Sequence, residues 1–379
     1  MTSYVPEPRP AQTDFLLSAM YFPGWKQQEH GGWKPLEAFR ERTPLLGYYD
    51  EGSPEVADWE IKWAVEHGIH AWIYCWFRLH ENVGHPLSRE ALMLDHALHD
   101  GLFHARYRKL MRFAIMWENE NLGGVSSKQD LLANLLPFWL ENYFHHPQYL
   151  VVDNKPVLFV FYMPHLVRDL GNAEAVADAM EEMREACRRD GFNGLIIAGE
   201  GRYQENDVPS LSAASGMDYA FSYCWYELGN NRPQQEYIDR QIEIMARWRD
   251  AGPIRFFPTA SMGWDPLPWQ NPNSDKAIYR PETLIRWLLS PDEYREVLSR
   301  TKNLMGTFAE DDLGRRLLVL DNWNEWCEGH YLAPHRRHGF GYLKAIREVF
   351  TACNNEPDYR LPDELGLGPY DSRYRRFCG

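Results

Sequence analysis

The sequence predicts an α/β protein folded as a single (β/α)₈ barrel of the TIM type. Charged, amphipathic segments repeatedly end at a glycine and lead into a short apolar run, as in WEIKWAVEHG before IHAWIYCWF. A glycine in this place supplies the left-handed conformation that ends a helix, and nearly continuous apolar runs are typical of parallel strands covered on both faces. Eight such runs occur, which is the number that this barrel requires.

The expected strands are separated by segments that mostly read as helices, although the connection between the fifth and the sixth is short and irregular. A doubly wound sheet is the alternative, but no glycine-rich phosphate loop follows the first run. The barrel is expected to occupy residues 14–352 as one domain, with residues 1–13 as an N-terminal extension and residues 353–379 as a C-terminal tail packed on the surface. The expected strands are residues 15–22, 70–77, 112–117, 156–163, 194–200, 218–225, 254–260 and 316–323.

Composition and charge exclude several classes of partner. The net charge of the 379-residue chain is −14, so neither nucleic acid nor an anionic membrane is expected as a partner. No uninterrupted apolar run approaches the ~20 residues that span a membrane. The first residues lack the regions of a secretory signal and the six cysteines form no CxxC pair, so a cytoplasmic protein with reduced thiols is predicted. The oligomeric state is not predicted.

No metal and no cofactor are predicted. His70, His80 and His85 lack the spacing of metal ligands, and the chain has no HExxH motif. The stretch GFGYLK at 339–344 contains GxG but lacks the third glycine and the preceding strand of a dinucleotide site. The chemistry is therefore expected to come from side chains of the protein itself.

Aromatic and acidic side chains gather where the expected strands end. The chain has 15 Trp and 21 Tyr, and stacking on apolar sugar faces is one use of such rings. Because the active site of this barrel lies at the C-terminal strand ends, a sugar-binding cleft is predicted there. For Tyr74 and Trp76 packing beneath the helices is an equal alternative, and Glu200 can instead form a salt bridge with Arg202. The expected substrate-binding residues are Tyr21, Tyr74, Trp76, Trp117, Asn119, Glu120, Tyr162, Glu200, Tyr223, Trp225, Trp264 and Asp265.

Two glutamates, Glu325 and Glu328, follow the eighth run in the stretch LDNWNEWCEGHYLAP. Their spacing on a turn or a first helical turn places both side chains on one side. Cleavage of a glycosidic bond uses two carboxyl groups, in surroundings dry enough to separate their pKa values. We therefore predict that this pair is catalytic and shares one pocket with Trp117, Tyr223 and Trp264. Three further residues of the stretch are expected to contact the substrate: Asn322, Trp326 and Tyr331.

The motif WNEWCEG resembles the WNEW-x-EG signature of the WbsX-like proteins, which are related to glycoside hydrolase family 99. The same resemblance covers, in order, YYDEGSPEVADWEIKWAVEHGI, WENEN, YLVVDNKPVLFVF, FPTASMGWD and GYLKAIREVF, and so spans about residues 16–350. It implies a metal-independent barrel whose relatives cleave α-mannosidic linkages with retention. In family 99 the first glutamate deprotonates the sugar 2-OH and the second acts as acid and then base; carried over, these are Glu325 and Glu328.

The sequence thus predicts a retaining glycoside hydrolase acting on an α-linked oligosaccharide or polysaccharide, with mannose as the sugar that the resemblance suggests. One alternative is a glycosyltransferase of surface-polysaccharide assembly, although the chain has no DxD motif suited to a sugar nucleotide. The other is a non-catalytic glycan-binding barrel. The chain departs from the family pattern at Cys327 and in HRRHGFG, beside the expected cleft, so the identity of the substrate is not carried over.

Overall fold

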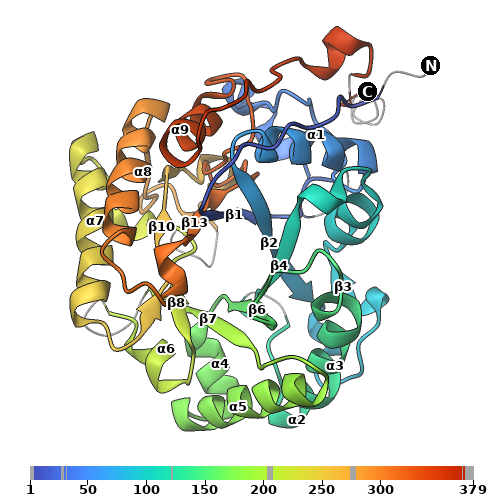
Figure 1. The fold of residues 1–379 in the computed structure, drawn as a ribbon, viewed down its shortest axis with the longest axis vertical. Helices are drawn as coiled ribbons and strands as arrows, with labels where there is room; N and C mark the ends of the chain where they lie inside the picture. The colour runs from blue at the N-terminus through green and yellow to red at the C-terminus, as the bar shows by residue number, and fades with distance from the viewer. Residues whose placement is uncertain are drawn as a thin grey trace.

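A computed structural model describes residues 4–26, 30, 32–120, 123–202, 208–273, 279–368 and 370–371. Its centre is a curved parallel sheet enclosed by helices (Figure 1). The strands follow the order β10-β13-β1-β2-β4-β6-β7-β8-β9. They are β1 (Leu16–Tyr21), β2 (Ile69–Arg78), β4 (Arg112–Trp117), β6 (Lys155–Val160), β7 (Ile196–Glu200), β8 (Tyr219–Phe221), β9 (Arg255–Phe256), β10 (Thr259–Ala260) and β13 (Leu317–Asn322).

The ring closes through the seventh expected strand, which is broken into β9 and β10. β9 pairs with β8, and β10 pairs with β13, both in parallel. Between them, Phe257 N–H donates to the carbonyl of Ala220 and Val319 N–H donates to the carbonyl of Pro258, at 2.8 and 2.9 Å. Proline has no N–H to give to a ladder, which explains the break. The predicted (β/α)₈ barrel is therefore confirmed, with all eight strands near their expected positions.

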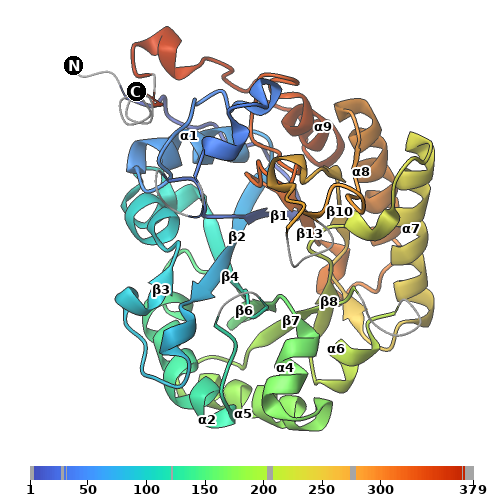
Figure 2. The same cartoon turned by 180° about the vertical axis from the view of Figure 1, so that it is seen from behind.

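Helices cover the outside of the sheet (Figures 1 and 2). The predicted pattern of helix, glycine and strand is present at Gly68, between α1 and β2, and at Gly191, between α5 and β7, and both have left-handed φ angles of 91° and 97°. α2 and α3 belong to one helical stretch over residues 128–144. The helices are α1 (Pro54–Val65), α2 (Lys128–Asp130), α3 (Leu136–Trp139), α4 (Met163–Leu170), α5 (Ala173–Arg189), α6 (Ser210–Ala214), α7 (Gln234–Ala251), α8 (Pro291–Met305) and α9 (Gly341–Phe350).

Short antiparallel additions decorate the barrel. β3 (Leu92–Met93) pairs with β2, and β5 (Val151–Val152) pairs with β6. β11 (Gly263–Trp264) and β12 (Trp287–Leu288) form a separate pair in the long loop after β10. This last pair brings a loop of the seventh unit close to the end of β13.

Side chains alternate between the barrel interior and the helix layer. On β2, the Trp76 indole donates to the Tyr143 hydroxyl at 3.0 Å and its ring lies 5.4 Å from that of Trp139, both in the helical stretch 128–144. The neighbouring Cys75 faces the opposite way: burial raises the pKa of its thiol, and the charges of Glu325 and Glu118 add to this effect. This alternation decides which strand-end residues can reach a site inside the barrel mouth.

The chain ends pack along α1. Ala11 N–H donates to the carbonyl of Val65 at 2.8 Å, and the Lys62 ammonium lies 2.7 Å from Glu66 and 3.5 Å from Asp358 of the C-terminal tail. Figure 2 shows this tail running from α9 past α1; residues 372–379 of the expected tail lie outside the described residues. Within the described ranges, no helix combines the length and the apolar character that crossing a membrane would need.

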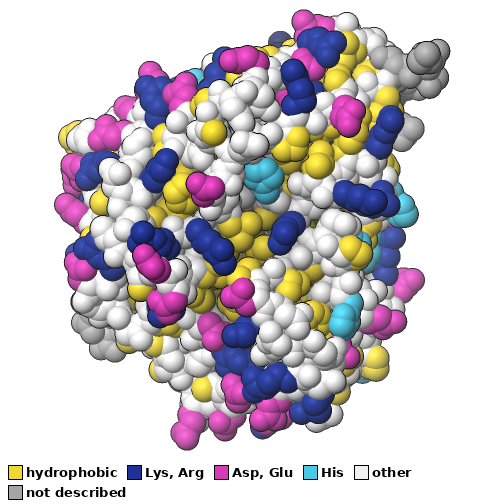
Figure 3. Space-filling model, viewed as in Figure 1, with side chains coloured by type: hydrophobic (Ala, Val, Ile, Leu, Met, Phe, Trp, Pro, Cys, Tyr) yellow, Lys and Arg dark blue, Asp and Glu magenta, His cyan; other side chains and the backbone are white. Residues whose placement is uncertain are grey.

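The face shown in Figure 3 carries hydrophobic side chains in its centre and charged side chains around them. Acidic and basic residues are interspersed on this face rather than gathered into one basic stripe. A contiguous basic stripe is the usual footprint of nucleic-acid binding. The charge on this face is thus mixed.

Candidate active site

The two glutamates lie on a tight turn that follows β13. The chain reverses so that Leu332 N–H donates to the carbonyl of Asn322 and Ala333 N–H donates to that of Trp323, both at 2.9 Å. Inside this turn Glu325 and His330 form an antiparallel bridge, and Gly329 adopts a left-handed φ of 76°. The turn, rather than a helix, thus places both carboxylates at the C-terminal end of the barrel.

Glu325 is almost completely enclosed, with 3% of its surface exposed. Its Oε1 atom has no hydrogen-bond partner among the described residues. Burial raises the pKa of Glu325 well above its ordinary value, and the charges of Glu328 and Glu51 add to this effect. A carboxyl in such surroundings favours its protonated form.

Glu328 is more accessible and has hydrogen-bonding partners on both oxygens. The Tyr279 hydroxyl donates to Oε1 at 2.8 Å, and Nε2 of His330 lies 3.3 Å from Oε2. Its side chain is 14% exposed. The pair therefore consists of one buried carboxyl, whose Oε1 has no partner among the described residues, and one carboxyl held by donors. Catalytic pairs exploit such a difference.

His330 connects the pair to β13. Its Nδ1 atom lies 2.6 Å from Oδ1 of Asp321 and 3.1 Å from the Asn322 amide nitrogen. Burial lowers the pKa of His330, but the charges of Asp321 and Glu328 and the hydrogen bonds to them outweigh burial and raise it to about 9. The Tyr223 hydroxyl donates to Asn322 Oδ1 at 3.2 Å, so Tyr223 belongs to the same hydrogen-bond network as Asn322 and His330.

Two of the expected aromatic residues meet at His330. The rings of Tyr223 and Trp264 lie 5.6 and 5.3 Å from the imidazole, and Tyr226 lies 5.1 Å from Trp264. The Trp264 indole N–H has no hydrogen-bond partner within the described ranges. The structure thus brings Tyr223, Trp264 and Asn322 together with the carboxylate pair.

Asp265 supports the turn through its backbone and its side chain. Its N–H donates to the carbonyl of Glu328 at 2.7 Å. Its carboxylate is held by Arg42 at 2.7 Å and by Arg286 at 2.7 Å. Through these contacts Asp265 holds the turn that carries the two glutamates in place.

Four more expected residues lie around the C-terminal opening of the barrel or support it. The Asn119 side chain exchanges hydrogen bonds with the backbone of Tyr162, at 2.9 and 2.8 Å. Burial raises the pKa of the Tyr162 hydroxyl, and the charges of Glu120 and Glu200 add to it, which places these three near one another. Glu200 pairs with Arg202, so the salt bridge considered as an alternative is present.

Five expected residues do not reach the pair, because strand alternation turns them toward the helix layer. Trp117 donates to the carbonyl of Gly123 and its ring lies 5.6 Å from Trp139. The Trp225 ring lies 5.4 Å from Trp248 of α7. Tyr21, Tyr74, Trp76, Trp117 and Trp225 are all buried, and contact of these five side chains with the substrate stays a prediction.

Trp326 and Tyr331 also lie away from the mouth. Their rings are 4.5 Å apart, and the Trp326 indole donates to the Tyr49 hydroxyl at 3.3 Å. Both are buried beneath the turn that carries the glutamates. These contacts support that turn, and a substrate contact of either side chain stays a prediction.

Sequence reasoning missed several residues that surround the pair. His330 stands two positions after Glu328 in the motif, and this closeness in the sequence is the signal that could have indicated a contact between them. Cys75 and Glu118 occupy the inward positions next to the tryptophans that were chosen instead. Tyr279 comes from the long loop between β11 and β12, where no pattern in the sequence indicates a contact with Glu328.

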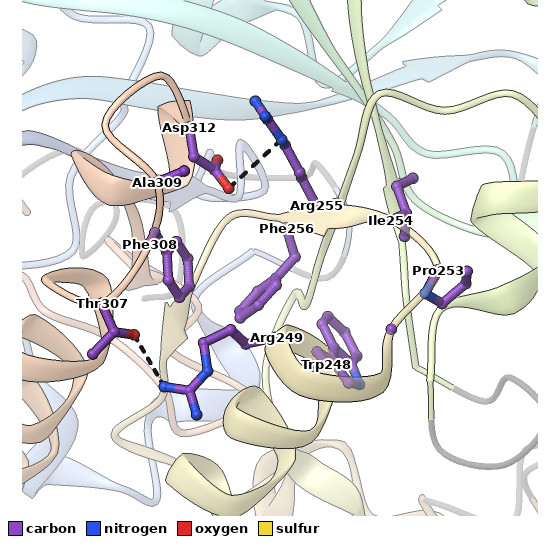
Figure 4. Close-up of a pocket in the computed structure, with 11 residues that line it drawn as sticks. Trp248, Arg249, Pro253, Ile254, Arg255, Phe256, Thr307, Phe308, Ala309 and Asp312 are labelled. Atoms are coloured by element: carbon purple, nitrogen blue, oxygen red, sulfur yellow. Dashed lines mark hydrogen bonds and ion pairs between the residues drawn. The ribbon is translucent and has the colours of Figure 1, made fainter.

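A separate cavity of about 390 Å³ lies at the other end of the barrel (Figure 4). Its walls come from the segments that precede β9 and β13, at the N-terminal ends of those strands, and the ion pair of Arg255 with Asp312 borders it. Residues at this end of the fold usually contribute to stability rather than to catalysis.

In the described ranges, no three His, Cys, Asp or Glu side chains are grouped as a metal ion would require.

Fold and site together define a (β/α)₈ barrel with a pair of carboxyl groups, one buried and one partly exposed, at the C-terminal ends of its strands. A model of the family described as glycosyltransferase WbsX matches residues 39–346. The chain therefore belongs to this family, which confirms the resemblance seen in the motif.

Comparisons with individual proteins agree with this placement. Two proteins named uncharacterized protein WxcX, from two strains of Xanthomonas campestris pv. campestris, are 24% identical over 329 residues, or 81% of this chain and 43% of theirs. The chain thus spans less than half the length of these relatives.

Two solved structures are also similar to this chain. A family 99 endo-α-mannosidase structure from Bacteroides thetaiotaomicron is 14% identical, and the match covers 89% of this chain and 97% of that one with a TM-score of 0.61. A structure described as a glycoside hydrolase-like protein is 15% identical, with coverage of 93% and 99% and a TM-score of 0.61. At these identities the likeness shows the fold.

Proposed function

We propose that the chain is a retaining glycoside hydrolase that acts on an α-linked glycan with Glu325 and Glu328 as its reacting carboxyls. The observation that carries the proposal is the contrast between the two acids. Glu325 has a buried oxygen without a partner in the described ranges, whereas Glu328 accepts from Tyr279 and faces His330. Two neighbouring carboxyls with different surroundings are the arrangement that supplies one acid and one base near neutral pH.

The surroundings of the pair suit a sugar. Trp264, Tyr226 and Tyr223 supply ring surface beside the carboxylates, and apolar faces of pyranose rings stack on such surfaces. Mannose is the sugar suggested by the name of the structurally similar endo-α-mannosidase, and an oligosaccharide or polysaccharide is the proposed substrate.

The chemistry follows from the family resemblance. One carboxylate removes the proton of the sugar 2-OH, whose oxygen attacks the anomeric carbon while the other carboxyl protonates the leaving oxygen. Water then opens the resulting 1,2-anhydro sugar with help from the carboxylate that has lost its proton, and the proton returns to the 2-oxygen. Two displacements at the anomeric carbon give retention. The resemblance assigns the first role to Glu325 and the second to Glu328.

A glycosyltransferase is the second candidate, because the family carries that description. It would use the same mouth to bind a nucleotide-activated sugar and an acceptor. A non-catalytic glycan-binding barrel is the third candidate. It would keep the aromatic residues and leave the glycosidic bond intact.

A panel of α-linked oligosaccharides and aryl glycosides tests the proposal with the purified protein. We expect turnover of at least one α-linked substrate, and proton NMR of the first-formed product should show the retained anomer. The Glu325→Gln/Glu328→Gln double variant is the control for contaminating activity. An inverted product would overturn the mechanism. Calorimetric binding of a sugar nucleotide without hydrolysis of any glycan would favour the transferase, and tight binding of an intact oligosaccharide would favour the non-catalytic barrel.

A further inference from the structure

We propose that His330 is a positioning residue that is held as a cation by Asp321 and keeps Glu328 ionised, so that the proton of the carboxylate pair resides on Glu325 in the free protein. The part of this inference that concerns catalysis rests on the proposed function. The part that concerns the protons does not, because it follows from the contacts of the resting protein.

The geometry of His330 favours the imidazolium. Its ring is fully buried, Nδ1 lies 2.6 Å from Asp321 Oδ1 and Nε2 lies 3.3 Å from Glu328 Oε2. Both ring nitrogens therefore face carboxylate oxygens, and only the doubly protonated ring donates at both positions. A neutral ring would turn a lone pair toward one of the two carboxylates.

Asp321 is well placed to hold that cation. Its Oδ2 accepts a hydrogen bond from Met262 N–H at 2.6 Å, and its Oδ1 accepts one from Asn322 N–H at 2.9 Å. Backbone donors favour the ionised form of a carboxyl. Both carboxylate oxygens of Asp321 thus accept hydrogen bonds on one side of the imidazole, and Glu328 Oε2 lies on the other side.

The same contacts separate the two glutamates. Glu328 receives one neutral donor from Tyr279 and one charged donor from His330, and both favour its anion. Glu325 receives no donor on Oε1 from the described residues, and a second anion beside Glu328 in a dry site is unfavourable. The other titratable groups whose charges act on one or both of these carboxyls or are affected by them are Glu51, Cys75, Cys224, Cys327, Tyr223, Tyr279 and His30.

This distribution bears on the roles of the two acids. A reaction that starts from the resting protein has its proton donor at Glu325 and its ionised base at Glu328. The family resemblance implies the opposite assignment. The contacts of His330 are thus a specific reason for this chain to differ, because His330 is the residue that makes Glu328 the better anion.

NMR of the full-length protein labelled with 15N-histidine tests the proton positions without any substrate. We expect one imidazolium whose two nitrogens stay protonated at pH 7 and which titrates near pH 9. Its signals should be absent in His330→Gln, and Asp321→Asn should lower its titration midpoint by about one pH unit or more because a neighbouring anion is lost. His335→Gln is the matched control, since His335 is also buried but burial lowers its pKa to about 4.

Two outcomes would overturn the inference. One is a neutral ring at His330 at pH 7, and the other is an unchanged midpoint in folded Asp321→Asn. If His330→Gln does not fold, the wild-type titration compared with Glu328→Gln decides the matter. Removal of the second anion should then lower the midpoint while the ring stays charged at pH 7.

Kinetics of the folded variants test the catalytic part. In His330→Gln, the acidic limb of the kcat/KM profile should move upward by about one pH unit, because the base loses its cation, whereas His335→Gln should leave the limb in place. An aryl glycoside with an acidic phenol should restore turnover to Glu325→Gln, and not to Glu328→Gln, since a good leaving group replaces much of the ~10²- to 10⁴-fold effect of an acid.

Rescue of Glu328→Gln instead would reverse the proposed roles even if the NMR result holds. Absence of turnover with every glycoside, together with the expected NMR result, would refute the hydrolase and leave the proton positions standing.

Discussion

The backbone N–H of Asp265 donates a 2.7 Å hydrogen bond to the carbonyl oxygen of Glu328. This bond joins the loop of the seventh barrel unit to the turn that carries the second glutamate. Arg42, which comes from the first βα loop, donates to the carbonyls of Asp265 and Trp326 at 2.9 and 3.1 Å. Segments far apart in the sequence thus fix the backbone on which the carboxylates stand.

Gly329→Ala should destabilise the protein and displace this turn. Gly329 has a φ of 76°, and an added Cβ would lie 2.7 Å from both Cβ and the carbonyl oxygen of Asp265. We expect a loss of about 2 to 4 kcal/mol in the free energy of unfolding, from the left-handed backbone and from the clash. Gly339→Ala is the control, because its φ is 55° but no atom lies within 4 Å of its Cβ. Its loss should be about 1 kcal/mol, and equal losses in urea unfolding would contradict the close approach at Asp265.

Arg78→Met should destabilise the protein strongly. Arg78 and Asp130 form a bidentate pair at 2.9 and 2.8 Å, and both side chains are buried. Removing the cation leaves a buried anion, which costs about 3 to 5 kcal/mol. Arg89→Met removes an exposed cation from Asp100 and should cost at most about 1 kcal/mol. Chemical denaturation of both variants measures the difference, and similar small losses would mean that water reaches Asp130.

Trp264→Phe and Trp225→Phe should affect different properties. Trp264 lies beside His330 at the mouth, so its replacement should lower kcat/KM or glycan affinity by about 3- to 10-fold, as a weakened aromatic contact would. Trp225 packs on Trp248 in the helix layer, so its replacement should lower the melting temperature and leave the affinity of the folded protein unchanged. The reverse pattern would show that the mouth lies on the other face of these strands.

The positions of the strands could be predicted from the sequence, but the direction of their side chains could not. A strand such as IHAWIYCWFR is buried on both faces, so its apolar residues do not alternate with polar ones. The pattern therefore does not show which side chains face the barrel interior and which face the helices. Trp76 and Cys75 were therefore equally good candidates for the barrel interior. The same uncertainty led to Trp117 in place of Glu118.

The glutamate pair could be found because it is local, with both residues on one turn after the last strand. Tyr279 could not be found, because its contact with Glu328 depends on the path of the loop between β11 and β12. His330 was within the quoted motif, yet its contact with Asp321, which is buried at the end of β13, is visible only in three dimensions. Long-range polar contacts of this kind have no periodicity that a sequence displays.

Glu60→Gln should stabilise the protein increasingly as the pH rises. Glu60 of α1 is buried and accepts a 2.8 Å hydrogen bond from the Tyr21 hydroxyl. Burial raises its pKa from 4.5 to about 8, against the opposing effect of hydrogen bonds and with a contribution from the charge of Glu51. Between these two values the folded protein binds more protons than the unfolded chain, so Glu60 lowers the stability of the wild type as the pH rises from about 4.5 to 8.

Glutamine is neutral throughout, so the stability of Glu60→Gln relative to the wild type should increase across that range. The gain should reach about 2 to 4 kcal/mol above pH 8, since each pKa unit corresponds to about 1.4 kcal/mol. Melting temperatures of both proteins at pH 5, 7 and 8.5 measure the trend. Glu66→Gln is the matched control on α1: Glu66 is also buried but pairs with Lys62 at 2.7 Å, so its replacement should destabilise the protein with no gain toward alkaline pH. A difference between Glu60→Gln and the wild type that is the same at pH 5 and 8.5 would mean that Glu60 is ionised in the folded protein.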